Sequence, residues 1–356
     1  MDVDRSLKRG LAKKRTKNYN YIVGVDVSKN KLDYAVMFDG KLLFHKVGSN
    51  DLEAIHQFLT ELKALPSFTM SRSFFCMENT GYYCNHLLSV LRKVKANVCL
   101  ENALQIKSSL GLIRGKYDKI DAVRIASYAL KNARSLRLWI PKRPEIELLA
   151  MLDGLRTRLQ TLQMSLRSSL KEQSTFIKRK LHTVTTDLCT NSILAVNADL
   201  VAIEREIDAL IQSDPLLKRL NQLITSVPNV GPVTAVQIIL TTNEFKDISQ
   251  PKKFACYAGV APFVKDSGLH KGKGKVSPLA NRRVKALLHI CSLNAIRHDR
   301  EIKFYYHRKA IVEGKPKMAV LNAVRNKLIN RIFACVNQDR VYRHALTTSE
   351  DIQQVN

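Results

Sequence analysis

The sequence lacks any apolar run long enough to cross a bilayer, and its basic amino-terminal stretch has no apolar core of the kind that a secretory signal needs. Its seven cysteines are scattered without a Cys-x-x-Cys pair, and its nine histidines show no metal-ligand spacing. A zinc site and a membrane protein are therefore disfavoured. An odd number of cysteines with apolar neighbours, in a chain without a secretory signal, predicts reduced, mostly buried thiols and a cytoplasmic location.

Acidic residues are also scarce. Lys and Arg number 58 against 31 Asp and Glu, which gives a formal net charge of +27 and an isoelectric point near 9.9. A positive balance of this size favours nucleic acid as the partner, with an anionic membrane as the less specific alternative. The 356 residues suffice for two or three domains with real cores.

The hydrophobic pattern divides the chain into five segments. They are a basic arm at 1–20, expected to be disordered, an α/β segment at 21–140, a helical segment at 141–218, a mainly helical unit at 219–337 with a glycine-rich basic insertion, and a polar tail at 338–356. The second segment alternates strand and helix signals, and this predicts a mixed α/β sheet as in an RNase H-like fold.

Local patterns within the second segment place its elements. Strands are expected at Tyr21–Val27, Leu32–Phe38, Lys41–Val47, Ser73–Met77 and Val98–Leu100, and helices at Leu52–Leu62, Tyr82–Val94 and Ala122–Leu130. Asp39-Gly40 is a strong hairpin turn between the second and third of these strands.

Leucines and other apolar residues follow alternating spacings of four and three in the third segment. The positions are Leu148, Leu152, Leu155, Leu159, Leu162 and Leu166, and then Val196, Leu200, Ile203, Ile207 and Leu210. This spacing predicts a coiled coil. It fits an antiparallel pair folded at its polar middle or an arm for dimerisation, and two amphipathic helices on an ordinary core fit it equally well.

Four carboxylates occupy distinctive positions. Asp26 and Glu78 each end a short apolar run, which predicts a strand delivering an acid to a sheet edge. Asp118 and Asp121 are three apart and share a face if that segment is helical. Four converging acids would repel unless a hard cation lies among them, and Mg²⁺ suits oxygen ligands and phosphate. In a basic chain, this predicts metal-assisted chemistry on a nucleic-acid phosphate.

The carboxyl-terminal half offers cationic candidates. The Pro228-x-x-Gly231 turn followed by Thr-Ala resembles a helix-hairpin-helix turn, whose N–H groups can hold a phosphate, although a plain helix-helix turn is the alternative. The loop after Pro262 is rich in lysine and glycine, and two arginines open the next helix. The candidate nucleic-acid contacts are Lys116, Asn229, Gly231, Lys265, Lys271, Lys273, Lys275, Arg282 and Arg283.

Several of these motifs occur together in one order. They are Gly24-Val25-Asp26-Val27-Ser28-Lys29, Met77-Glu78-Asn79-Thr80-Gly81-Tyr82, Lys116-Tyr117-Asp118-Lys119-Ile120-Asp121-Ala122, Pro228-Asn229-Val230-Gly231, and Ala258-Gly259-Val260-Ala261-Pro262 followed by Ser267-Gly268. Over roughly residues 21–335 the combination resembles the transposases of insertion sequence family 110, which use a DEDD acid cluster and a bridge RNA, and the related Piv-type DNA invertases. The basic arm is extra to that pattern, and Ser277–Asn281 is less typical of it.

The resemblance implies a RuvC-like domain in which Asp26, Glu78, Asp118 and Asp121 bind Mg²⁺. It implies a carboxyl-terminal transposase domain with Ser267 as the nucleophile, although by spacing alone a structural serine would be favoured there. Attack on DNA would leave a 5′-phosphoserine link and a free 3′-OH.

The resemblance also implies partners. A structured bridge RNA would pair with double-stranded target and donor DNA, and the active site would combine subunits of a homo-oligomer, a dimer assembling to a tetramer, associated with the bacterial nucleoid.

Other functions remain open at this point. A RuvC-type junction endonuclease would use the same acids with water as the nucleophile and form no covalent intermediate. A Piv-type invertase would rejoin DNA in the opposite orientation. A non-catalytic nucleic-acid scaffold is disfavoured because the four acids and the Ser-Gly pair are intact.

Overall fold

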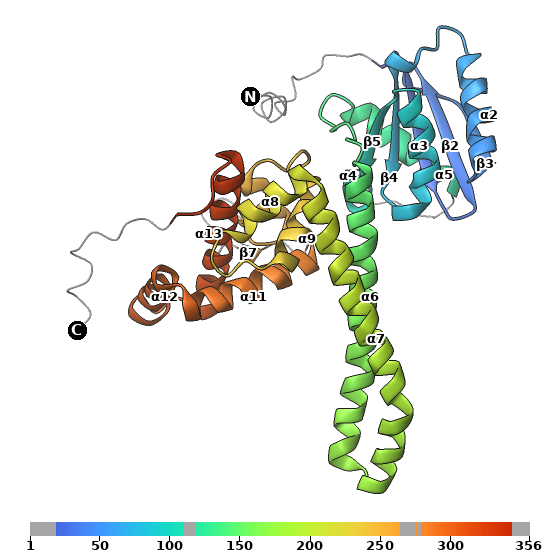
Figure 1. Cartoon of the computed structure of the whole chain (residues 1–356). Coiled ribbons are helices and arrows are strands. Elements are labelled where there is room, and N and C mark those ends of the chain that lie inside the picture. Colours follow the sequence, from blue (N-terminus) through green and yellow to red (C-terminus); the bar gives the residue numbers. More distant parts are fainter. Residues whose placement is uncertain (1–18, 110–117, 264–274, 277–278, 344–356) are drawn as a thin grey trace. The chain divides into compact units, whose positions relative to one another are not determined.

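The computed structural model describes residues 19–109, 118–263, 275–276 and 279–343, with the side chains of 118, 119 and 275 left out. It consists of two compact units, Met1–Pro141 and Lys142–Asn356 (Figure 1). Most of the predicted basic arm and part of the polar tail lie outside the described residues. No described helix is long and apolar enough to cross a membrane.

The first unit is built on a five-stranded mixed sheet. Its strands are β1 (Tyr21–Val27), β2 (Lys31–Phe38), β3 (Lys41–Ser49), β4 (Ser73–Glu78) and β5 (Asn97–Glu101), in the spatial order β3-β2-β1-β4-β5. The first three form antiparallel pairs, whereas β4 runs parallel to both β1 and β5. All five predicted strands are present, and the α/β, RNase H-like fold class is confirmed.

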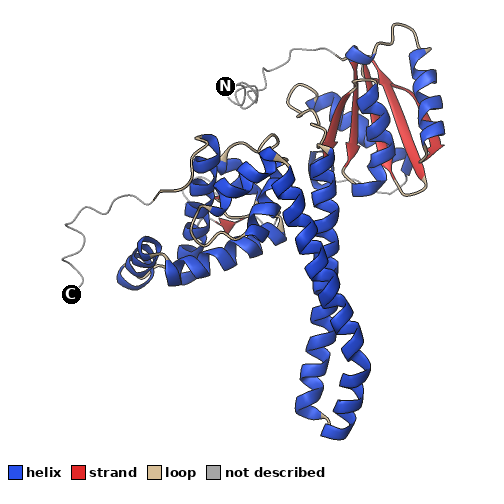
Figure 2. Ribbon diagram, viewed as in Figure 1, coloured by secondary structure: helices blue, strands red, loops and turns tan. Residues whose placement is uncertain are grey.

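Helices cover both faces of this sheet (Figure 2). On one face α2 (Leu52–Lys63), the 3₁₀ turn η3 (Gly81–Cys84) and α3 (Asn85–Lys93) enclose a core that includes Phe58 and Leu87. On the other face α4 (Ala103–Ser109) and α5 (Asp118–Asn132) cover Ile22 and Phe74.

Three details differ from the sequence expectation. The helix expected at Tyr82–Val94 begins as a 3₁₀ turn, and α4 was not expected. The helix expected at Ala122–Leu130 begins earlier, at Asp118, so that both aspartates belong to it. An acid in the first helical turn is favoured by the helix dipole, and this explains the earlier start.

The second unit begins with a long antiparallel hairpin of helices. Helix α6 (Pro144–Phe176) and helix α7 (Arg179–Ser213) pack along one another, as the leucine spacing predicts. On α7 the expected positions Ile203 and Ile207 are buried, but on α6 Leu148, Leu155 and Leu162 are exposed. Only some of the heptad side chains of α6 therefore pack against α7, and the others are exposed.

A helical body completes the second unit. It contains α8 (Pro215–Thr225), α9 (Pro232–Thr242), α10 (Pro251–Tyr257), α11 (Arg282–His298), α12 (Arg300–His307), the π-helical turn η4 (Arg308–Val312) and α13 (Lys317–Asn337). Phe254, Leu288 and Phe333 lie at its core. The mainly helical character of this part is confirmed, and all seven cysteines are free thiols, five of them buried.

Candidate active site and nucleic-acid contacts

Asp26 and Glu78 lie side by side at the carboxyl ends of two parallel strands. The β1–β4 register pairs Val25 with Met77, and each acid is the next residue of its strand. Neighbouring strands are about 4.8 Å apart, so the backbones of the two acids lie at about that spacing and their side chains leave the same face of the sheet. Both residues are partly exposed. The pairing of β1 with β4 thus brings together the two acids that the sequence placed at strand ends.

Helix α5 packs directly on the face that carries these acids. A Cβ atom added at Gly24, two residues before Asp26, would lie 2.3 Å from the Ala126 nitrogen and 2.4 Å from the Ala122 oxygen. Only glycine permits such an approach of helix backbone to strand. Because Ala122 lies against Gly24 and α5 starts at Asp118, the first turn of α5 is at the same sheet end as Asp26 and Glu78.

The two aspartates of that turn differ in what can be described. The Asp118 backbone is helical, and its side chain lies outside the described part. The Asp121 side chain is 28% exposed, and its Oδ1 accepts a hydrogen bond from the Arg124 Nη1 at 2.7 Å. Arg124 therefore holds one oxygen of Asp121 within its own helix, and a cation at this site would compete with that guanidinium.

Two further acids, which the sequence analysis missed, extend the row across the sheet. Asp33 on β2 is the register partner of Asp26, and Glu101 on β5 is the register partner of Glu78. The sequence held a signal for Glu101, because it ends an apolar run as Asp26 and Glu78 do. Four carboxylates thus stand in one line on neighbouring strands.

The two outer acids of the row have partners within the protein. Asp33 is 3% exposed and lies 3.3 Å from both the Lys31 ammonium and the His45 Nε2. The Glu101 Oε2 accepts a hydrogen bond from the Tyr128 hydroxyl at 3.2 Å. Burial, with a contribution from the Glu101 charge, raises the pKa of Tyr128 above its ordinary value. Asp33 and Glu101 therefore already bind neighbouring side chains of the protein.

The donors at this sheet end suit a hard cation. Carboxylate oxygens on adjacent strands and on a helix start are the ligands that Mg²⁺ prefers. Among the described side chains, no three acidic, histidine or cysteine groups already lie close enough to hold a metal. The Asp118 side chain is not part of that set. The carboxylates suit Mg²⁺ by their chemistry, and the Asp121–Arg124 pair is the contact that would have to rearrange.

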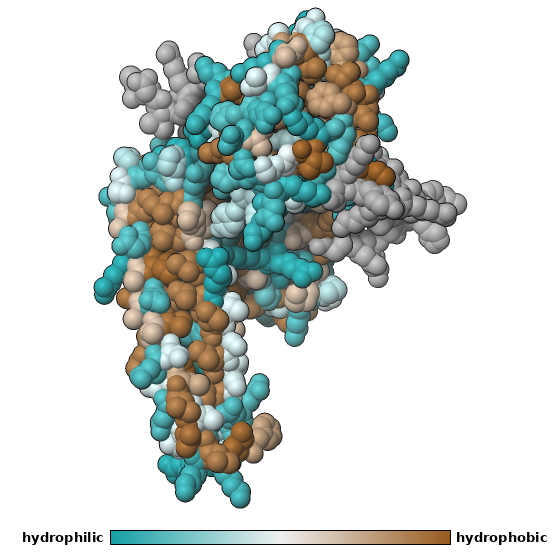
Figure 3. Space-filling view, turned by 90° about the vertical axis from the view of Figure 1, so that its right-hand side faces the viewer, coloured by the Kyte–Doolittle hydropathy of each residue, from teal (hydrophilic) through white to brown (hydrophobic). Residues whose placement is uncertain are grey.

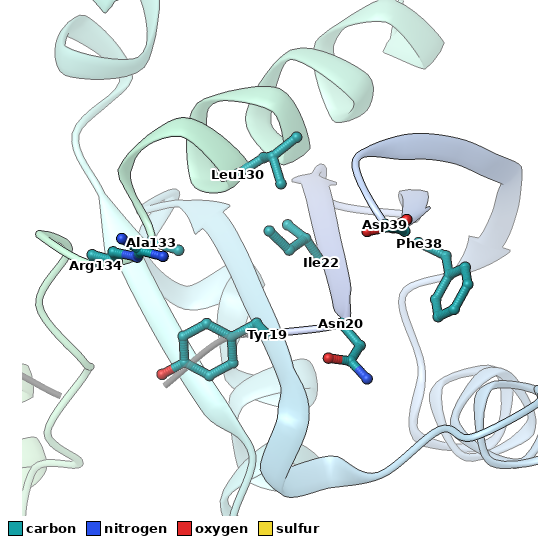
Figure 4. A pocket seen from close by; sticks show the side chains of 8 residues that line it. All are labelled: Tyr19, Asn20, Ile22, Phe38, Asp39, Leu130, Ala133 and Arg134. Atoms are coloured by element: carbon teal, nitrogen blue, oxygen red, sulfur yellow. The ribbon is translucent and has the colours of Figure 1, made fainter. Parts of the chain in front are cut away.

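A pocket of about 460 Å³ lies at the opposite end of the sheet (Figure 4). It is lined by Tyr19, Asn20, Ile22, Phe38, Asp39, Leu130, Ala133 and Arg134. These residues come from the amino end of β1, the β2–β3 turn and the carboxyl end of α5. Because the acids stand at the carboxyl end of β1, this pocket does not belong to their site.

The Pro228–Gly231 turn joins α8 to α9 as a tight connection. Asn229 has a φ of +67°, the left-handed conformation that asparagine tolerates, and the Val230 N–H donates to the Val227 oxygen at 3.1 Å. Gly231 is the N-cap residue of α9, and open space surrounds its Cα. Asn229 is partly exposed and Gly231 is exposed. The turn therefore leaves its surface open to a ligand such as a phosphate.

The lysine-rich loop is described only at its ends. Strands β6 (Pro262–Phe263) and β7 (Lys275–Val276) pair antiparallel and tie the two ends of the loop together. Ser267 lies outside the described residues, as do four of the predicted lysine contacts, Lys116, Lys265, Lys271 and Lys273, and the side chain of Lys275.

The two arginines at the start of α11 have different environments. Arg282 is exposed. Arg283 makes a bidentate ion pair with Asp153 of α6, at 2.9 Å for each of its two N–O contacts. Asp153 is 3% exposed and also accepts a hydrogen bond from Arg156 at 2.6 Å. The bidentate geometry predicted for Arg283 is thus used on a protein carboxylate, and Arg282 is the one that faces solvent.

Two family models match the sequence. A transposase model named DEDD_Tnp_IS110 matches residues 23–175, and the model of the transposase IS116/IS110/IS902 family matches residues 221–307, so that together they span about two thirds of the chain. The chain belongs to the IS110 family of transposases. It is accordingly a DNA transposase or recombinase, with the RuvC-like acid domain that the strand order shows.

Individual relatives agree with this family. The pilin gene-inverting protein of Moraxella bovis is 24% identical over 331 residues, which cover 90% of this chain and 97% of that protein. An uncharacterized 43.6 kDa protein of insertion element IS110 from Streptomyces coelicolor is 27% identical over 165 residues, 46% of this chain and 39% of that protein. Among solved structures, Thermus thermophilus RuvC in complex with a Holliday junction substrate matches at 15% identity with a TM-score of 0.27, covering 34% of this chain and 100% of that chain.

Proposed function

We propose that this IS110-family protein cuts and rejoins DNA with two sets of groups, a Mg²⁺-binding cluster of Asp26, Glu78, Asp118 and Asp121 and the nucleophile Ser267. The observation that supports the cluster most directly is the β1–β4 register, which sets Asp26 and Glu78 side by side where α5 begins. Bound Mg²⁺ would polarise the scissile phosphate and stabilise the charge on the attacking and leaving oxygens.

In the covalent step, one bond to phosphorus forms as another breaks. The Ser267 Oγ would form a bond to phosphorus as its proton leaves, and the bond to the 3′-oxygen would break to give a free 3′-OH. The strand would remain joined to the protein through a 5′-phosphoserine link. Attack by a second 3′-OH on that phosphorus would restore the serine, and no external energy source is needed because the phosphodiester is conserved.

Nucleic acids are the proposed partners of the positive charge. With +27 formal charges, the chain can neutralise backbone phosphates of target and donor DNA and of a structured bridge RNA. In that arrangement base pairing by the RNA selects the sequence, and the protein reads the backbone. Arg282 and the open Asn229–Gly231 turn are the described residues that suit such contacts.

A second copy of the chain is the proposed partner of the α6–α7 hairpin. Figure 3 shows an apolar stripe along this hairpin. Exposed leucines occur on both of its helices, among them Leu155 and Leu162 on α6 and Leu188 and Leu194 on α7. The heptad spacing continues through the exposed α6 leucines, and such a repeat suits packing against another helix. A dimer formed here, and a tetramer formed from two dimers, would allow acids and serine from different subunits to meet.

A covalent-adduct assay tests this function. The protein is incubated with its flanking-region RNA, Mg²⁺ and cognate DNA, and products are separated on a denaturing gel. We expect an adduct with the wild type that is lost in Ser267→Ala and in Glu78→Gln. Asp39→Asn, at the opposite end of the same sheet, is the matched control and should keep it. Cleavage without an adduct that survives Ser267→Ala would instead establish a hydrolytic junction nuclease.

DNA inversion is a second candidate, favoured by the similarity to the pilin gene-inverting protein over 90% of this chain. A plasmid carrying two cognate sites in inverted orientation distinguishes the two outcomes. Inversion of the intervening segment would support an invertase, whereas joining of a separate donor would support transposition. A protein that binds both DNAs and yields neither product would be a scaffold.

A further inference from the structure

Arg325 on α13 is a buried cation that has no acidic partner among the described residues. The residue is 5% exposed, and within the described parts of the chain no Asp or Glu oxygen lies at ion-pair distance from it. Its Nη2 lies 2.6 Å from the His289 Nδ1 and its Nη1 lies 3.3 Å from the Asn322 Oδ1, both neutral groups. Among the described residues, none accepts a hydrogen bond from its Nε.

Two other arginines of this unit that are buried or largely buried have acidic partners. Arg156 is 3% exposed and donates to Asp153, and Arg331, on the same helix as Arg325, contacts Asp299 at 2.9 Å and Glu301 at 2.5 Å. Removing a charge from water is costly unless an opposite charge replaces the water. Burial lowers the pKa of Arg325, but a guanidinium stays protonated in proteins. Without an acid among the described residues, the burial of Arg325 carries a cost in stability.

His289 supplies a second donor beside this cation. A guanidinium has no acceptor, so the His289 Nδ1 must accept from Arg325 and the ring proton must lie on Nε2. Burial, and then the Arg325 charge, lower the pKa of His289 and keep the ring neutral. His289 is only partly buried, so the pair reaches the surface of the helical body. The His289 Nε2–H is thus the donor available to an anion at the surface, and the buried Arg325 charge lies directly behind the ring.

The pair lies next to groups already proposed to contact nucleic acid. The Asn322 Nδ2 donates to the Val260 oxygen at 2.5 Å, just before β6, where the lysine-rich loop begins. On α11, His289 is seven residues after the exposed Arg282, which places both on one helix face roughly 10 Å apart. A phosphate backbone that contacts Arg282 can continue along this face.

We propose that Arg325 and His289 form a binding site for a backbone phosphate of DNA. A phosphate oxygen would accept from the His289 Nε2–H, and the negative charge of the phosphate would offset the charge of the guanidinium buried behind the ring. This inference rests on the proposed function only for the choice of DNA as the ligand. Arg325 is then a residue whose charge lowers the stability of the free protein and raises its affinity for DNA.

Two arginines of one helix provide the test, Arg325→Met and the matched control Arg331→Met. For Arg325→Met we expect an unchanged or higher thermal unfolding midpoint, roughly tenfold weaker binding of duplex DNA, and a slope of log affinity against log salt that is smaller by about one. For Arg331→Met we expect a lower midpoint, because two acids lose their partner, and an unchanged salt slope.

A second pair of variants separates charge from geometry. Arg325→Lys keeps the charge but loses the planar guanidinium that donates to the His289 Nδ1, and should keep most of the salt slope while it weakens binding. His289→Gln can accept from Arg325 and still donate, so it should bind more tightly than His289→Phe. Inorganic phosphate should raise the unfolding midpoint of the wild type more than that of Arg325→Met, and an RNA hairpin run in parallel shows whether RNA shares the site.

Opposite results would overturn the proposal. A lower midpoint for Arg325→Met with an unchanged salt slope would make Arg325 a structural residue. Equal losses of DNA binding in Arg325→Met and Arg331→Met would show a general loss of folding, and tighter binding of the RNA hairpin than of DNA would assign the site to RNA. None of these readouts needs strand transfer, so the proposed chemistry can fail in the adduct assay while this site is confirmed.

Discussion

Charged groups are arranged differently in the sheet unit, where like charges lie side by side, and in the helical unit, where opposite charges pair. In the sheet unit the register lines up like charges, with Asp26 beside Glu78 at one edge. In the helical unit buried carboxylates attract cations from distant segments, as Asp153 does with Arg283 and Glu244 does with Arg143. Ion pairs between distant segments support the helical unit, and the ligands proposed for the two units have opposite signs, a cation at the acids and a phosphate at Arg325.

Gly24→Val tests the sheet side and has the largest expected effect. The new side chain would meet backbone atoms of Ala122 and Ala126, which cannot turn aside, so α5 must move off the strand. We expect a loss of unfolding free energy of at least about 3 kcal/mol, measured by urea unfolding. At Gly48 an added Cβ would be 3.7 Å from Tyr34, an ordinary contact, so Gly48→Ala is the control. Equal stability of the two variants would contradict the close packing.

Glu244→Gln tests the paired charges of the helical unit. The Glu244 side chain is fully buried and receives hydrogen bonds from Arg143 and Lys246. Loss of its charge removes a buried carboxylate from Lys246 and from Arg143, which keeps its ion pairs with Asp214 and Glu145. We expect a loss of about 2–3 kcal/mol in the free energy of unfolding, because Arg143 is partly exposed. Glu145, 3.5 Å from the same arginine but at the surface, is the matched control, with an expected change below about 0.5 kcal/mol.

The pH dependence of stability tests the same network at Asp214. A hydrogen bond from Arg143 holds the Asp214 pKa below its ordinary value of 3.8. Its contribution is therefore fully present above pH 3.8 and is lost as the pH falls through the lower, folded-state pKa. Asp214→Asn should cost about 1–2 kcal/mol at neutral pH and flatten the acid limb of the stability curve. An equally steep acid limb in the variant would rule out this origin.

Asn281→Ala has the smallest expected effect and concerns the cations of α11. Its Oδ1 accepts a hydrogen bond from the Val284 N–H at 3.0 Å and caps the helix that carries Arg282 and Arg283. We expect a loss of about 1 kcal/mol in thermal or urea unfolding. Asn281→Asp keeps the cap and should retain the wild-type stability. A neutral Asn281→Ala would mean that the Arg283–Asp153 ion pair alone fixes this helix start.

Much of the fold followed from local patterns. Apolar runs and the Asp39-Gly40 turn predicted all five strands, because these signals act over a few residues. The leucine spacing predicted a coiled coil and left the antiparallel hairpin as one of several arrangements. The start of α5 is an exception, since the apolar spacing places the two aspartates before the helix, whereas they open it. The exposure of Leu148 and Leu162 was also not predicted, because a heptad pattern does not say which partner covers it.

The sequence by itself determined the Asp26 and Glu78 strand ends, the Asp118–Asp121 spacing and the positive charge, all of which depend on neighbouring residues or on composition. Only the tertiary structure decided which charges meet. Strand register placed Asp33 and Glu101 beside the predicted acids. Helix packing paired Arg283 with Asp153, 130 residues away, and left Arg325 without an acid among the described residues, because such contacts arise between segments that the chain brings together only on folding.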